Sequence, residues 1–144
     1  MGAVGVIGGG LVSAVTGPLS WEHGPWAAAY LVLVVGVAQL GFGAGQAWLA
    51  VGPPARGLVV GELLGWNLGS ALVITGAVVE RPVLVDIGAV LLVAAVVCFL
   101  VGVRAPTPGR GPVVVWGRRA YLLLALVILV SIPVGLVLAA LGSA

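Results

Sequence analysis

The chain has 144 residues, of which 62% are hydrophobic and 7% are charged, and its formal net charge is +2 at pH 7. A soluble domain carries about a quarter charged residues, so this composition excludes an ordinary soluble globular protein. Apolar blocks of roughly 20 residues follow one another, which is the length that a helix needs to cross a bilayer. The sequence therefore predicts an all-α, polytopic membrane protein whose residues 1–144 form a single transmembrane domain.

In chain order, the predicted membrane spans cover residues 2–20, 26–50, 57–79, 82–103 and 119–142. We expect these five helices to form a compact bundle. The segment 2–20 is the weakest, because its six glycines make it a poor helix former. A broken or surface-lying helix is the alternative for this segment, and it would leave four spans.

Arginines are distributed unequally between the predicted loops. The loops after the second and fourth spans hold Arg56, Arg104, Arg110, Arg118 and Arg119, whereas the other loops hold only Arg81. The positive-inside rule then predicts a plasma-membrane protein with its amino terminus in the cytoplasm and its carboxy terminus outside. The absence of lysine, with abundant Gly, Ala, Val and Arg, indicates a GC-rich bacterial source.

The longest predicted loop, residues 104–118, is basic and rich in proline. We expect it to be irregular, cytoplasmic and exposed, with its VVVW stretch dipping into the membrane interface. Its arginines are predicted to contact anionic lipid headgroups or an acidic partner; they are Arg104, Arg110 and Arg118, with Arg119 beside them. No lysine-containing phosphate loop is present, and we expect no nucleic-acid partner.

The stretch WEHGPW, residues 21–26, holds the single histidine of the chain. Gly24-Pro25 predicts a turn that leads into a helix, and the two tryptophans are typical of a membrane interface. The competing interpretation is a proton or metal site that uses His23 and Glu22 with acidic residues of a neighbouring turn. Because such a site needs several converging ligands, we favour the turn and predict no metal.

Four polar side chains lie inside the second and third spans. The short connection VGPPAR predicts that these helices are antiparallel neighbours, which brings Gln46 level with Glu62 and Gln39 level with Asn67. At 1.5 Å per residue, the first pair lies roughly 7 Å inside the membrane and the second roughly 15 Å. Hydrogen bonding across the helices avoids the cost of bare polar groups in hydrocarbon, and we predict both pairs. A carboxylate in a span is also a candidate for proton relay or solute binding.

Glycines in the same two spans predict close helix packing. Gly57, Gly61, Gly65 and Gly69 recur every four residues and form a ridge that a second helix can approach closely. Gly36 and Gly43 lie on one stripe with Gln39 and Gln46. A further outer cluster is formed by Asp86 and Thr75, with Tyr30 at similar depth; the simpler interpretation is that Asp86 caps its helix.

These residues leave open whether the protein is a structural subunit or a transporter. We expect a non-catalytic accessory subunit that packs with itself or within a larger membrane assembly, with the bilayer as its environment. The alternative is a small transporter or channel component that moves protons or a small polar solute along the intramembrane polar residues. No catalytic set is recognisable, and a single histidine at the outer edge makes a haem carrier the weakest choice, so we predict no enzyme and no cofactor.

Overall fold

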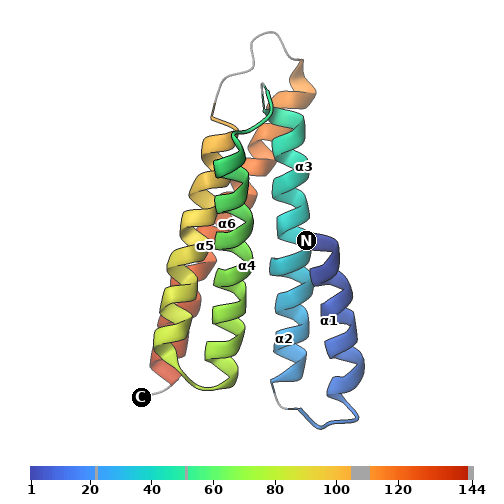
Figure 1. Ribbon diagram of the computed structural model, residues 1–144, viewed down its shortest axis with the longest axis vertical. Helices are drawn as coiled ribbons and strands as arrows, with labels where there is room; N and C mark the ends of the chain where they lie inside the picture. The colour runs from blue at the N-terminus through green and yellow to red at the C-terminus, as the bar shows by residue number, and fades with distance from the viewer. Residues whose placement is uncertain (22, 51, 105–110, 143–144) are drawn as a thin grey trace. The chain divides into compact units, whose positions relative to one another are not determined.

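Figure 1 shows the computed structural model of the protein, which describes residues 1–21, 23–50, 52–104 and 111–142. These residues form helices and turns without a β-strand among them, so the predicted all-α class is confirmed. The chain divides into two compact units, Met1–Gly43 and Ala44–Ala144.

In the described part of the chain, four helices are long and apolar enough to cross a membrane. The first runs without interruption through α2 (Gly24–Tyr30), η1 (Leu31–Ala38) and α3 (Gln39–Leu49), and the others are α4 (Arg56–Val78), α5 (Pro82–Gly102) and α6 (Pro112–Gly142). The predicted bounds of the first three are correct to within two residues. The predicted start of α6 is wrong, because residues 112–118 are helical and not part of an irregular loop. Pro112 suits the first turn, where its missing N–H is not needed.

The glycine-rich first segment forms α1 (Gly2–Thr16), a helix of 15 residues. At 1.5 Å per residue it is about 22 Å long, less than the roughly 30 Å of a hydrocarbon core. Pro18 follows two residues after the end at Thr16, and it has no N–H with which to continue the helical hydrogen bonds. The predicted span 2–20 is therefore too long, and the four-span alternative agrees with the lengths of the helices.

In the first unit, α1 packs against α2 and η1 through its glycines (Figure 1). Gly5 and Gly9 are buried, and a methyl group on either would lie within 3 Å of backbone atoms of Gly36 or Ala28. The two helix backbones are thus nearly in contact, which only residues without a side chain allow. The glycines that weaken α1 as an isolated helix are the residues that hold it against its neighbour.

The segment η1 is π-helical, with hydrogen bonds to carbonyl groups five residues earlier. A π-helix has more residues per turn than an α-helix. The stripe that α-helical spacing predicts through Gly36 and the residues of α3 therefore does not run straight through η1. Beyond it, the buried stripe of α3 runs Gln39, Phe42, Gln46 and Leu49. Gly43, predicted to lie on this stripe, is exposed.

In the second unit, α4 and α5 form an antiparallel pair around the turn at Glu80, whose φ of 53° is left-handed. Gly69 faces Gly88: a methyl group on Gly69 would lie 2.8 Å from the carbonyl oxygen of Gly88. Trp66 of α4 meets Phe99 of α5 edge to face, with ring centroids 5.9 Å apart. Helix α6 packs on α5, and more than half of its residues between Pro112 and Val134 are exposed.

Candidate functional site

The side chains of Gln46 and Glu62 meet where α3 ends and α4 begins. The Gln46 Nε2 atom donates a hydrogen bond of 2.5 Å to Glu62 Oε1. Both residues are buried: Gln46 is 6% exposed and Glu62 is 2% exposed. This pairing was predicted from the depth of the two residues and is confirmed. Among the described residues, Glu62 is the only buried carboxylate.

Two glycines make room for this pair and for the ring beside it. Gly102, the last residue of α5, faces the carboxamide of Gln46, and a methyl group there would overlap its nitrogen. Gly45 of α3 lies under the ring of Tyr121, a residue of α6. The Tyr121 hydroxyl donates a 2.9 Å hydrogen bond to the carbonyl oxygen of Phe99. The end of α3 thus contacts α4, α5 and α6 around the carboxylate.

A buried column continues along α4 from the carboxylate. Glu62, Trp66 and Ser70 follow at intervals of four residues, and each is at most 2% exposed. The Ser70 Oγ atom has no hydrogen-bond partner among the described residues. These residues also recur every four positions in the sequence, but the buried face of α4 was predicted from its glycines, which lie on the adjacent face. Trp66 and Ser70 were therefore missed as members of the buried face.

The second predicted pairing, Gln39 with Asn67, would join residues of different units, and it stays a prediction. The Asn67 Nδ2 atom donates to the carbonyl oxygen of Leu63 in its own helix, at 2.8 Å. The carboxamide of Gln39 is buried, and neither of its polar atoms has a hydrogen-bond partner among the described residues. An asparagine can return its amide to the preceding helical turn, and this local bond removes the need for a partner on another helix.

The glycine ridge of α4 is used over only part of its predicted length. A methyl group on Gly65 would lie 3.3 Å from Ala95 Cβ, and Gly69 is tighter still, so both glycines lie against α5. Gly61 reaches only the sulfur of Cys98, and Gly57 has open space around it. Gly57 and Gly43 were predicted as packing positions, but no described atom lies within 4 Å of a methyl group built at either one. The open positions lie near helix ends or on exposed faces, where spacing alone does not reveal whether a neighbour is present.

The described residues of the stretch WEHGPW agree with the predicted turn between α1 and α2. Gly24 N–H donates to the Trp21 carbonyl oxygen at 3.0 Å, and Pro25 stands in the first turn of α2. His23 is exposed, and Tyr30 packs its ring 5.5 Å from that of Trp26. Glu22 lies outside the described residues.

The outer carboxylate Asp86 does not cap α5. The helix begins at Pro82 with Arg81 before it, which places Asp86 beyond the first turn. Thr75 and Asp86 are both exposed, and no hydrogen bond among the described residues joins their side chains. Thr75 and Asp86 were predicted to lie at the same depth along the two helices. The antiparallel register of α4 and α5, in which Gly76 faces Val85, agrees with this prediction.

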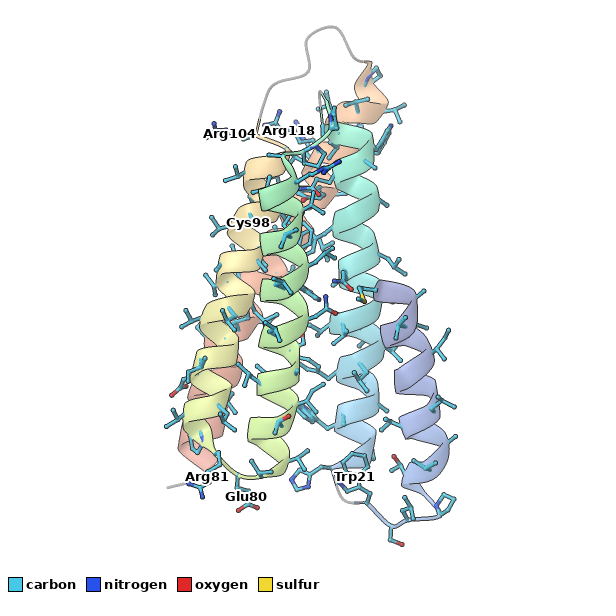
Figure 2. All side chains as sticks on the ribbon, viewed as in Figure 1. Trp21, Glu80, Arg81, Cys98, Arg104 and Arg118 are labelled. Atoms are coloured by element: carbon cyan, nitrogen blue, oxygen red, sulfur yellow. The ribbon has the colours of Figure 1, made fainter. Side chains whose placement is uncertain are left out.

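The arginines of the second unit separate into two groups (Figure 2). Arg104 and Arg118 lie at the end where α5 stops and α6 starts, and Arg81 lies with Glu80 at the opposite end of the α4–α5 pair. The Arg119 guanidinium lies 5.3 Å from the centre of the Trp116 ring. Arg110 lies outside the described residues.

Within the described ranges, no three His, Cys, Asp or Glu side chains come together as metal ligands. Comparisons with protein-family models, curated proteins and solved structures find no match for this chain. Function is therefore inferred from the residues themselves. Their chemistry is that of a carboxylate held by an amide donor, with an aromatic hydroxyl engaged by a backbone carbonyl nearby.

Proposed function

We propose that the protein is a non-catalytic membrane subunit, whose helices assemble with one another and with a larger membrane complex or further copies of the chain. The observation that carries the proposal is the Gln46–Glu62 hydrogen bond. It satisfies the buried carboxylate by a neighbouring helix, as a structural bond does. Gly102 lies against Gln46 and Gly45 lies against Tyr121, and neither position has room for a larger side chain.

The exposed surface of α6 supports the assembly part of this proposal. Large apolar side chains cover it; Leu123, Leu126 and Val127 are each more than half exposed. Lipid covers such a surface in a single subunit, and apolar helices of a partner cover it in a complex.

We further propose a plasma-membrane location, with the Arg104–Arg118 end in the cytoplasm and the carboxy terminus outside. The support is the separation of arginines between the two ends of the α4–α5 pair. The amino terminus lies in the cytoplasm if α1 crosses and outside if it does not.

A small transporter or channel component is the second candidate. It is favoured by Glu62, a carboxylate within a span, and by the buried Ser70 hydroxyl, whose hydrogen-bonding capacity is unused among the described residues. Buried polar atoms of this kind often bind water or a polar solute.

Two measurements separate the candidates. Native mass spectrometry of the protein extracted in mild detergent should find oligomers or a bound partner protein, and a purely monomeric species would contradict the subunit proposal. In proteoliposomes loaded with a pH-sensitive dye, wild type and Glu62→Gln should show the same proton leak. A wild-type proton flux that Glu62→Gln abolishes, in a protein that remains folded, would establish the transporter instead.

A further inference from the structure

The junction between α5 and α6 brings two arginines together. Arg118 Nη2 donates a hydrogen bond of 3.3 Å to the backbone oxygen of Arg104, which follows the last turn of α5. Arg118 is half-buried and is held by this bond, whereas the side chain of Arg104 is exposed. A guanidinium has five N–H donors, so most of those on Arg118 remain for another acceptor.

Among the described residues, no exposed carboxylate lies at this end of the unit. Glu62 is buried and bonded to Gln46, whereas Glu80 and Asp86 belong to the opposite end of the α4–α5 pair. The fourth acidic residue of the chain, Glu22, lies outside the described residues. Arg56 adds a further cation where α4 begins. An anion from outside the chain is the natural counterion for this end of the unit.

Apolar side chains stand directly beside these cations. Trp116 and Val113 are each 67% exposed, and the Arg119 guanidinium packs over the Trp116 ring. Gly117 lets this turn of α6 lie against Trp48, since a methyl group there would come within 2.8 Å of the indole. Exposed valine and tryptophan gain nothing from a soluble anion, but both suit the glycerol and upper acyl region of a lipid, with the indole at the interface.

We propose that Arg104, Arg118 and Arg119, with Trp116, bind the phosphate group of an anionic phospholipid. The guanidinium groups supply the paired N–H donors that phosphate oxygens accept. The indole contacts the lipid at headgroup level and holds Arg119 toward the phosphate. This inference does not depend on whether the protein is a subunit or a transporter; it requires only that the helices lie in a membrane.

The test uses the full-length protein in a neutral detergent, titrated with short-chain phosphatidylglycerol while thermal unfolding is followed. The unfolding temperature should rise with lipid concentration in a saturable manner. Short-chain phosphatidylcholine, inorganic phosphate and a soluble oligoglutamate peptide should give little rise at the same concentrations. An equal rise with phosphatidylcholine or inorganic phosphate would overturn the proposal, and an equal rise with oligoglutamate would replace the lipid by an acidic protein partner.

The variants Arg104→Gln and Arg119→Gln each remove one guanidinium that makes no hydrogen bond to a described residue. Each should weaken the apparent affinity for phosphatidylglycerol about fivefold, as expected for the loss of one arginine near an anionic headgroup. Arg81→Gln, at the opposite end, is the matched control and should bind as wild type does. Equal weakening by Arg81→Gln, or none by the other two, would show that the lipid response is nonspecific and overturn the site.

Discussion

Gln46 donates its side-chain amide to the carboxylate of Glu62, and this single bond of 2.5 Å joins the end of α3 to the second turn of α4. The two helices are connected by only a few residues, so the bond closes the hairpin next to its turn. Burying an amide or a carboxylate in hydrocarbon without a hydrogen-bond partner costs roughly several kcal/mol of free energy. When the two groups bond to each other, most of this cost is avoided. This buried polar contact therefore helps to fix how the end of α3 meets α4.

Substitutions of Glu62 separate hydrogen bonding from charge. Glu62→Gln keeps an acceptor oxygen for the Gln46 amide and should unfold within about 1 kcal/mol of wild type, whereas Glu62→Leu leaves that buried amide without an acceptor and should cost about 1–3 kcal/mol. Unfolding in mixed detergent micelles, followed by circular dichroism, measures both. Equal losses for the two substitutions would show that the acceptor oxygen has no role.

Gly102→Ala tests whether the end of α5 shapes the site. The added methyl group would overlap the Gln46 nitrogen and displace the carboxamide from Glu62, so we expect destabilisation of about 1–3 kcal/mol. Gly57→Ala is the control, because that glycine has open space around it. Helix propensity should leave the control neutral or slightly stabilised. The same micelle unfolding assay applies, and two equally stable variants would contradict the close contact at Gly102.

Gly69→Leu tests the α4–α5 contact. Gly69 faces the backbone of Gly88, and a leucine there should separate the two helices and prevent folding or lower stability by more than about 3 kcal/mol. Gly57→Leu, on the same helix in open space, should fold normally. Yield of monodisperse protein by size-exclusion chromatography compares the two, and similar yields would refute the tight packing at Gly69.

The positions of the helices could be read from the sequence because hydrophobic length is a strong signal. The bounds predicted for α4, 57–79, differ by one residue at each end from the observed Arg56–Val78. The first segment shows the limit of this signal, since its apolar composition extends to residue 20 whereas α1 ends at Thr16. The helical turns from Pro112 to Arg118 were missed because prolines and arginines before a span are also typical of a loop.

The site was predictable only for two residues that lie on helices joined by one short loop. Gln46 and Glu62 flank one short turn, so their depths could be compared directly. Gly45, Gly102 and Tyr121 come from three helices, and no spacing within one segment relates them. Asn67 donates its amide to the preceding turn of its own helix, and depth matching does not consider that possibility.

Reporter fusions test the orientation of the helices. A fusion after Gly111 should report the cytoplasm and a fusion at the carboxy terminus the outside, because the arginines gather where α5 ends and α6 begins. Both fusions reporting the same side would contradict a membrane-crossing α6. A tag at the amino terminus then shows whether the 15-residue α1 crosses.

A double-mutant cycle on Gln46 and Glu62 tests the central claim most directly. The free energy of unfolding in mixed micelles is compared for Gln46→Leu, Glu62→Leu, the double variant and wild type. If the two side chains stabilise the hairpin through their mutual bond, the double variant should be less damaging than the sum of the single ones, with a coupling of about 0.6–2 kcal/mol. Strictly additive losses, with no coupling, would contradict the account and show that neither side chain depends on the other.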